Sequence, residues 1–248
     1  MPELRHGPLG ERLVQLKSDL VEQGRHVQRI VEAAVQSIFE KDRSLAEKVV
    51  KEDEVIDRVD IRIERTAVAL LTESLQLCAA GTASDEAPLN AYQVRMILTI
   101  VKVNNEFERI ADLAVAMVAR MSAWLKLPGD PPRRFRVMAN SVIGMIEHSI
   151  MSLEDMDTDA ARLVLASDDA TEAFREAILR ENEEELAGGN RSAEYAFALN
   201  RVAAAIARMA DHCTNVAEQV IYVETGKIVR HTDEQWTEPS EPDFEDEQ

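Results

Sequence analysis

The sequence repeats one order of segments on either side of a proline-rich stretch, residues 127–132 (LPGDPP). Each half reads as a helix that ends in an acidic turn, a second helix with spaced carboxylates, a loop, and a third helix. The third helices carry related motifs, Glu-Arg-Ile-Ala-Asp at 108–112 and Ala-Arg-Met-Ala-Asp at 207–211. Such a repeat is typical of a duplicated structural unit, and short connections make consecutive helices antiparallel neighbours. The sequence therefore predicts an all-α fold of two tandem, pseudo-symmetric antiparallel three-helix bundles.

Local signals set the expected boundaries of these helices. Short turns are predicted at residues 41–44, where Ser44 is the expected N-cap, and at residues 157–159. Longer breaks rich in Gly, Ser, Pro or Asn are predicted at residues 79–90 and 187–192. The expected organisation is a first repeat at 10–125, a linker at 126–134, a second repeat at 135–226 and an acidic tail at 227–248. The charge and proline content of the tail predicts disorder.

Composition narrows the functional classes. The chain has 46 acidic against 28 basic residues, a formal net charge of -18, which disfavours nucleic acid and anionic lipid surfaces as partners. It contains neither a secretory signal nor an apolar run long enough to insert into a membrane, so a cytoplasmic location is expected. Cys78 and Cys213 have no zinc or redox spacing and are expected to be reduced thiols. Because neither a nucleophile–base pair nor a Gly-rich phosphate loop is recognisable, an enzyme is not expected.

The third helix of each half has two distinct faces when its residues are placed at about 100° per residue. Polar residues gather on one face, Glu108 with Asp112 in the first half and Asp211 with Asn215 and Glu218 in the second. The opposite faces are apolar and predict the core: Val103, Phe107, Ile110, Ala114, Met117 and Met121 in the first half; Val202, Ile206, Met209, Cys213, Val216 and Val220 in the second.

The second helices add carboxylates that are spaced three or four residues apart. They are Asp53, Asp57, Asp60 and Glu64 in the first half, and Asp168, Glu172 and Glu176 in the second. Like charges at this spacing destabilise a helix unless a positive group lies between them. Clustered carboxylates suit hard metal ions such as Mg, Ca, Mn or iron. A solvated face whose acids pair with nearby arginines explains the same pattern, and the sequence leaves both interpretations open. His212, about 100° away from the carboxylates, is expected to be partly buried and hydrogen-bonded rather than a ligand.

Three segments resemble the PhoU family of phosphate-transport regulators. Residues 208–231 (RMADHCTNVAEQVIYVETGKIVRH) are similar to the closing signature of the family, and residues 105–117 (NEFERIADLAVAM) resemble the same motif in a first repeat. The segment that begins at Lys51-Glu52-Asp53 resembles the acidic second helix of the family. The resemblance extends over roughly residues 10–231.

This resemblance implies a fold, partners and a cofactor. It implies two three-helix bundles, a cytoplasmic homodimer without catalytic activity, and a role in coupling a phosphate ABC transporter ATPase to a sensor histidine kinase. In that role the family represses the phosphate-starvation response when phosphate is plentiful. Some members hold iron or other metal clusters on Glu/Asp-x-x-x-Asp motifs, so iron, Mn, Mg or another hard divalent or trivalent metal is implied here. The matching positions in this sequence are Asp53, Asp57, Glu108 and Asp112 in the first repeat, and Asp168, Glu172, Asp211 and Glu218 in the second.

One departure from the family pattern makes the two implied sites unequal. The glutamate that precedes Arg-Ile-Ala-Asp is Glu108 in the first repeat but Ala207 in the second. The second site is therefore expected to bind metal more weakly, or to use Asn215 and Glu218 in compensation. Two other functions remain open: an accessory subunit of a phosphate permease, and a carboxylate metal-binding bundle of the ferritin-like kind. The latter class uses Glu-x-x-His, whereas Glu147 and His148 are adjacent.

Overall fold

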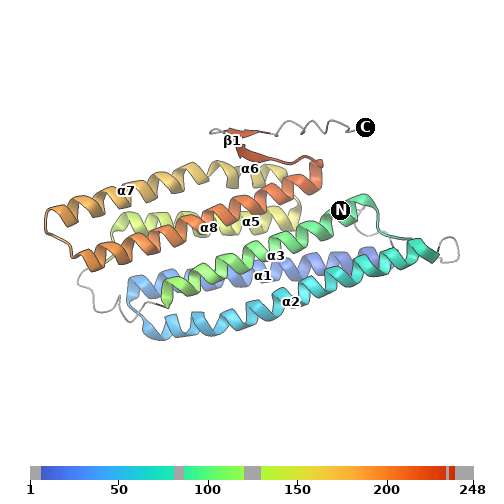
Figure 1. Ribbon diagram of the computed structural model, residues 1–248, viewed down its shortest axis with the longest axis horizontal. Helices are drawn as coiled ribbons and strands as arrows, with labels where there is room; N and C mark the ends of the chain where they lie inside the picture. Colours follow the sequence, from blue (N-terminus) through green and yellow to red (C-terminus); the bar gives the residue numbers. More distant parts are fainter. Residues whose placement is uncertain (1–6, 81–86, 120–129, 233–234, 238–248) are drawn as a thin grey trace, which may run out of the picture.

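The computed structural model describes residues 7–80, 87–119, 130–232 and 235–237. The first repeat consists of α1 (Gly7–Glu40), α2 (Arg43–Ala80) and α3 (Ala91–Val118); the second consists of α5 (Arg133–Asp155), α6 (Thr158–Ala166), α7 (Asp168–Ala187) and α8 (Ala193–Thr225). The helices run lengthwise along the molecule (Figure 1). The predicted all-α class and the two bundles are confirmed.

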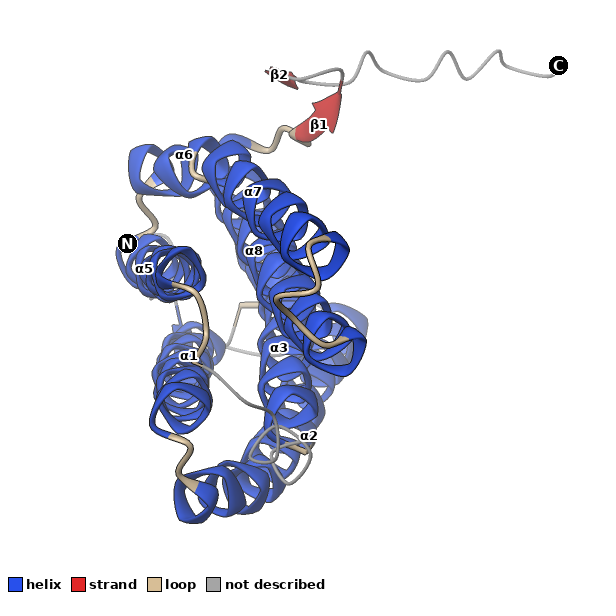
Figure 2. Cartoon of the chain, turned by 90° about the vertical axis from the view of Figure 1, so that its left-hand side faces the viewer, coloured by secondary structure: helices blue, strands red, loops and turns tan. Residues whose placement is uncertain are grey.

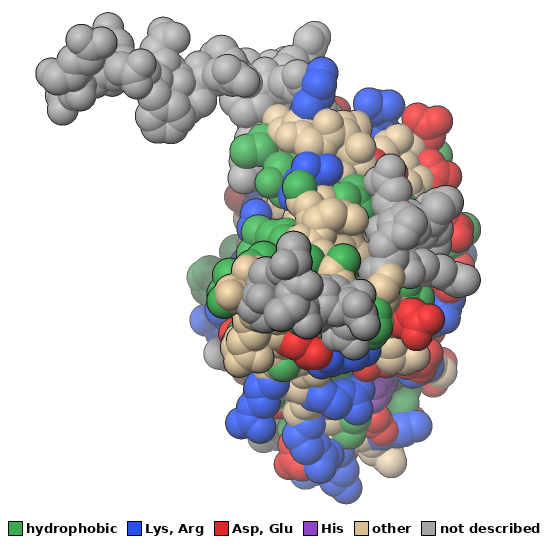
Figure 3. Space-filling model, turned by 90° about the vertical axis from the view of Figure 1, so that its right-hand side faces the viewer, with side chains coloured by type: hydrophobic (Ala, Val, Ile, Leu, Met, Phe, Trp, Pro, Cys, Tyr) green, Lys and Arg blue, Asp and Glu red, His purple; other side chains and the backbone are tan. Residues whose placement is uncertain are grey.

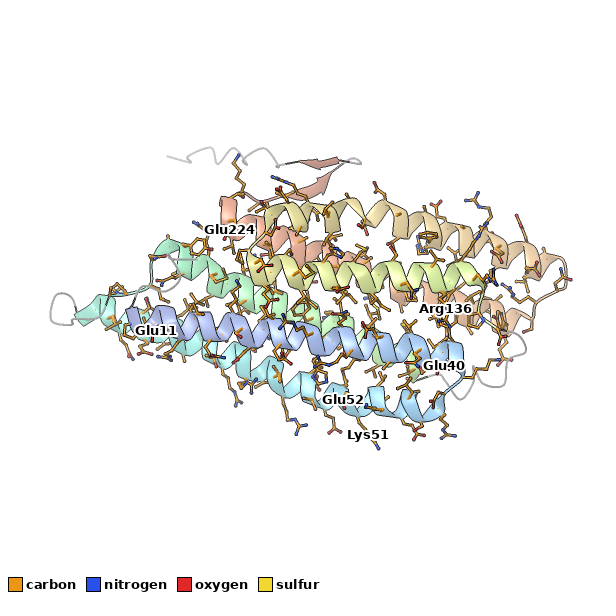
Figure 4. The ribbon with its side chains drawn as sticks, turned by 180° about the vertical axis from the view of Figure 1, so that it is seen from behind. Glu11, Glu40, Lys51, Glu52, Arg136 and Glu224 are labelled. Carbon is orange, nitrogen blue, oxygen red and sulfur yellow. The ribbon has the colours of Figure 1, made fainter. Side chains whose placement is uncertain are left out.

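The two repeats pack into two shared layers. Figure 2 shows α1 and α5 in one layer, and α2, α3, α8 and α7 side by side in the other. The repeats meet where α3 packs on α8 and α1 packs on α5. In Figure 4, Arg136 at the start of α5 lies near the Glu40 end of α1, and its guanidinium carbon is 4.0 Å from the centre of the Phe39 ring. The second layer brings the carboxylate-bearing helices of both repeats together.

Capping residues define where several helices begin. The side chain of Asp42 accepts a hydrogen bond from the Leu45 amide at 3.1 Å, so the N-cap of α2 is Asp42 and the prediction of Ser44 was wrong. The predicted N-cap was two residues too late. Aspartate and serine side chains can both cap a helix, and the turn before α2 is shorter than expected. Asp157 caps α6 by accepting from the amides of Asp159 and Ala160. The predicted turn at 157–159 is therefore a helix start.

The second helix of the second repeat is interrupted, which the sequence did not predict. The break lies at Ser167, between α6 and α7. The Ser167 hydroxyl donates to the Leu163 carbonyl at 2.8 Å, and its amide donates to the Val164 carbonyl. Such local bonds from a serine bend or interrupt a helix. The helix α2 has no corresponding break, so the two repeats differ in this arm.

One hydrophobic core runs through both repeats. Among the described residues, every position predicted for the apolar stripes of α3 and α8 is buried; Met121 lies outside the described residues. Gly24 on α1 lies where the repeats meet, and a Cβ atom there would come within 2.8 Å of the Phe107 ring and 3.0 Å of Ile150. Lys17, 5% exposed, donates from Nζ to the Glu154 carbonyl at 2.7 Å, which ties α1 to the end of α5. The bundles are thus joined by apolar packing and by specific hydrogen bonds.

The segment after α8 differs from the expectation of disorder beyond residue 226. The strands β1 (Arg230–Thr232) and β2 (Gln235–Thr237) pair antiparallel, with His231 opposite Trp236. β-Branched and aromatic residues favour strands, and they are frequent in this short segment of the tail. Residues 238–248 lie outside the described residues. Within the described part of the chain, no helix is long and apolar enough to cross a membrane.

Candidate functional site

The first repeat brings its four predicted site residues together on facing sides of α2 and α3. The Asp53 carboxylate interacts electrostatically with Asp57 and with Asp112, and Glu108 interacts with Asp112 and Asp57. The only basic side chain that acts on Glu108 among these interactions is Arg109. Its Nε lies 3.6 Å from a Glu108 oxygen, and its Nη1 lies 3.9 Å from an Asp112 oxygen. We define the first carboxylate cluster as six acids: Asp53, Asp57, Asp60, Glu64, Glu108 and Asp112.

The charges of the first carboxylate cluster are held in unfavourable surroundings. Burial, and then repulsion from Asp57 and Asp112, raises the pKa of Asp53. Burial raises the pKa of Glu108, Asp112 raises it further, and Arg109 opposes this rise. For Asp60 the pKa is raised by burial and then by Glu64 and Asp57. A cation near these oxygens would therefore relieve repulsion.

The donor set of this cluster fits a hard metal ion. Carboxylate oxygens from two adjacent helices are the ligand type that Mg, Mn or iron prefers. The side chains do not yet converge, since no group of three or more His, Cys, Asp or Glu in the described ranges is arranged to hold an ion. Binding would thus require new rotamers of these exposed or half-exposed side chains.

The second repeat gives its carboxylates a different environment. Glu172 on α7 forms a two-pronged ion pair with Arg175, whose Nε donates to Oε2 at 2.7 Å and whose Nη2 donates to Oε1. This hydrogen bonding is the main reason that the pKa of Glu172 is lowered. Burial raises the pKa of Asp211 on α8, while His212, Arg208 and Arg175 act in the opposite direction. We call Asp168, Glu172 and Asp211 the second carboxylate cluster. Arg175 lies beside it and neutralises the charge of Glu172.

Glu218 is not part of the second carboxylate cluster. The sequence placed it on the exposed face with Asp211, whereas the structure leaves its side chain only 6% exposed. It lines a groove together with residues of α2 and α3, among them Lys102 and Asn105. Asp168, at the start of α7, acts on the buried Cys213 thiol, whose pKa is raised mainly by burial. Both cysteines are free, as expected, Cys78 exposed and Cys213 buried.

A groove of about 830 Å³ is lined by residues of α2, α3 and α8. Asp60 and Glu64 from α2 line it, as do Asn105 and Glu106 from α3, and Asn215 with Glu218 from α8. The groove therefore extends the first carboxylate cluster toward the second repeat.

A hydrogen-bond network crosses the boundary between the repeats in this groove. Nδ1 of His212 lies 2.6 Å from Oε2 of Glu106, and the Asn215 amide donates to the same oxygen at 3.0 Å. The expectation of a partly buried, hydrogen-bonded His212 is confirmed. Glu106 was missed by the sequence analysis because a polar residue next to a core residue is ordinary in an amphipathic helix, and its partners lie on α8.

A hydrogen bond from the buried Asn104 holds Asp60 of the first carboxylate cluster. The Asn104 amide donates to Oδ1 of Asp60 at 2.7 Å, and Asn104 accepts from Gln23 of α1 at 3.1 Å. Asn104 is 2% exposed and was also missed. It fixes the orientation of α2 against α1 and α3.

Comparison with known proteins gives consistent results. The family model described as "PhoU domain" matches residues 20–121 and 135–220. The chain is 28% identical over 228 residues to "Phosphate-specific transport system accessory protein PhoU homolog 1" of Thermotoga maritima, covering 91% of this chain and 92% of that one. It is 29% identical over 227 residues to the PhoU homolog of Aquifex aeolicus, covering 90% and 96%.

Two solved structures share the fold. The PhoU structure from Streptococcus pneumoniae gives a TM-score of 0.75 at 18% identity, covering 90% of this chain and all of that chain. The PhoU structure from Pseudomonas aeruginosa gives 0.74 at 24% identity, covering 87% and 98%. At these identities the likeness establishes the arrangement of the helices.

Proposed function

Since this chain belongs to the PhoU family of phosphate transport regulators, we propose that it restrains phosphate uptake and starvation signalling by coupling a phosphate ABC transporter to a sensor histidine kinase. The observation that carries this proposal is the match of the family model to both bundles, with relatives of nearly the same length that are named as accessory proteins of phosphate transport. The family is regulatory and not enzymatic, so the activity must reside in binding.

We further propose that the first carboxylate cluster is the metal-binding part of the protein. The pKa values of Asp53, Asp60 and Glu108 are raised by burial and by repulsion from neighbouring acids, and Arg109 lies 3.6 Å or more from the carboxylate oxygens. A bound hard cation would neutralise this charge and fix α2 against α3. Glu108 and Asp112 would supply oxygens from α3, and Asp53 and Asp57 would supply them from α2.

The signalling role is tested in cells that lack this protein and carry a reporter for phosphate-starvation genes. The expected result is a reporter that is active in high phosphate, and its repression on restoring the chain. The protein should also co-purify with the transporter ATPase or the kinase sensor domain from phosphate-replete cells. Recovery of neither partner, together with a silent reporter, would contradict the signalling role.

The same experiment separates the permease-subunit alternative. An accessory subunit of a permease predicts altered uptake of labelled phosphate while the kinase reporter stays repressed. A regulator predicts that both change together.

A further inference from the structure

The side of α2 that faces away from the carboxylates carries a groove with arginines around it. Arg58, Arg62 and Arg65 are spaced four and three residues apart, and lie roughly 140° around α2 from the carboxylates when about 100° is allowed per residue. Arg12 of α1 completes the set, and Ile61, Thr66 and Ala69 form the rest of the lining of a hollow of about 340 Å³. We call this hollow the arginine groove. Figure 3 shows basic side chains gathered at the lower edge of the molecule, the edge that α2 forms in Figure 1.

Most of the positive charge of the arginine groove is not neutralised within the described part of the chain. Arg12 pairs with Glu73, and Nε of Arg58 donates to the backbone carbonyl of Glu54. Arg62 and Arg65 have no carboxylate within 4.0 Å among the residues that the structure describes. None of the described residues that line the groove is a carboxylate. In a chain with a net charge of -18, this is a local surface of the opposite sign.

The chemistry of the lining defines the occupant. Guanidinium groups bind carboxylates in planar, two-pronged pairs, so three or four of them suit several acids in a short segment. Ile61 is 46% exposed and offers an apolar contact beside them. A matching segment would be extended, strongly acidic, and would carry one large apolar side chain between its acids.

The C-terminal segment of this chain has that composition. Residues 238–248 (EPSEPDFEDEQ) contain no lysine or arginine, and a single aromatic residue, Phe244, lies between Asp243 and the acids Glu245, Asp246 and Glu247. Pro239 and Pro242 disfavour a helix before it. We propose that residues 238–248 of one copy bind in the arginine groove of a second copy, with Phe244 against Ile61 and the flanking carboxylates on Arg58, Arg62 and Arg65.

Distance favours a second copy over the same chain. The strands β1 and β2 lie at the α6–α7 edge of the molecule, and α2 forms the opposite edge (Figures 1 and 2). Seven residues from Thr237 to Phe244 span at most about 25 Å. Three helix-to-helix steps of roughly 8–10 Å separate α7 from α2, and the arginine groove lies on the far side of α2. The inference does not depend on the proposed signalling role.

The test compares association of the full chain with that of a chain truncated after Thr237, by sedimentation velocity over a range of concentrations and salt. The double variant Arg62→Glu/Arg65→Glu is compared with Arg162→Glu/Arg180→Glu, which makes the same charge change at exposed arginines of α6 and α7. We expect truncation and the groove variant each to weaken association by roughly tenfold or more, high salt to do the same, and the control pair to leave it unchanged. Equal association of the full chain, the truncated chain and both double variants would overturn the proposal.

A second measurement locates the contact. A spin label at Gln248→Cys, in a Cys78→Ser background, leaves Phe244 in place, and this protein is mixed with isotope-labelled protein that carries no spin label. Broadening of amide signals at residues 58–69 in the isotope-labelled copy is the expected result. Broadening elsewhere on the surface, or at 58–69 only when both labels are on one chain, would overturn binding between copies.

Discussion

The two carboxylate clusters begin from similar motifs, yet the pKa values of Glu108 and Glu172, each near an arginine, are shifted in opposite directions. In the first, burial and repulsion raise the pKa of Asp53 and Glu108, and Arg109 stands 3.6 Å or more away. In the second, Arg175 takes both oxygens of Glu172 and lowers its pKa. The state of a carboxylate therefore depends on the side chains one turn away more than on the motif that contains it.

This difference has a functional consequence. An external cation should help most where the neighbouring arginine makes only long contacts, as Arg109 does with Glu108 and Asp112, whereas Glu172 must first give up its two-pronged pair with Arg175. The metal binding that we propose is therefore expected in the first repeat and not in the second. The predictions below challenge this comparison, starting with the largest effect.

Asp112→Asn and Asp211→Asn should have unequal effects on metal binding. Asp112 acts on both Asp53 and Glu108, so its loss should weaken Mn²⁺ binding by roughly 100-fold, at least the effect typical of outer-shell groups. Asp211→Asn should change it by less than about threefold. The measurement is titration with Mn²⁺ followed by electron paramagnetic resonance, with elemental analysis of protein purified without chelator. Absence of metal in every preparation would remove the metal proposal, and equal losses would remove the asymmetry.

Glu106→Ala should break the hydrogen-bond network that links α3 of the first repeat to α8 of the second. It leaves the ring nitrogen of His212 and the amide of Asn215 without their shared acceptor, at a cost of about 1–3 kcal/mol in the free energy of unfolding. The exposed neighbour Asn105 is the control, and Asn105→Ala should stay within about 0.5 kcal/mol of the parent. Urea unfolding measures both. Equal stability of the two variants would show that the network does not join the repeats energetically.

The sequence predicted the helices and the core faces well because both depend on periodicity. The apolar stripes of α3 and α8, read at about 100° per residue, are the buried faces. The burial of Glu218 could not be predicted, because the exposure of a helix face depends on which other elements pack beside it. The break at Ser167 and the cap at Asp42 follow from hydrogen bonds that several nearby residues could equally have made.

The members of the first cluster were found from spacing and family resemblance, yet their charge state was not. The sequence contains Glu172 and Arg175 three residues apart, and also Glu108 beside Arg109. Only the rotamers distinguish a two-pronged pair from a distant one. The packing of α3 against α8 could likewise not be predicted from local sequence patterns.

Arg175→Met should make the second cluster resemble the first. Without the guanidinium, Glu172 and Asp211 repel each other, and the pKa of Glu172 should rise toward its ordinary value. In an Asp112→Asn background, where the first cluster is disabled, we expect Mn²⁺ affinity to increase by about tenfold. Arg180→Met removes an exposed arginine one turn beyond Glu176 and should have no effect. No gain with Arg175→Met would show that the second cluster lacks ligands as well as free charge.

Neutralising one acid in each cluster should change stability in opposite directions in metal-free protein. The pKa of Asp53 is raised, so its ionised form opposes folding, and Asp53→Asn should add about 0.5 kcal/mol to the free energy of unfolding at neutral pH. The pKa of Glu172 is lowered, so its ionised form favours folding, and Glu172→Gln should cost about 0.5 kcal/mol there.

The pH dependence of these two variants distinguishes charge from packing. As pH falls, parent Asp53 takes up a proton in the folded state before it does so in the unfolded chain, so the advantage of Asp53→Asn should shrink toward the ordinary pKa of 3.8. The cost of Glu172→Gln should persist down to the ordinary value of 4.5 and disappear below it, as the folded-state carboxylate is protonated. Urea unfolding at neutral pH and at about pH 3, below both ordinary values, should therefore show both differences reduced at the lower pH. A difference that stays constant with pH in either variant would assign it to side-chain packing, and the electrostatic contrast between the two clusters would not stand.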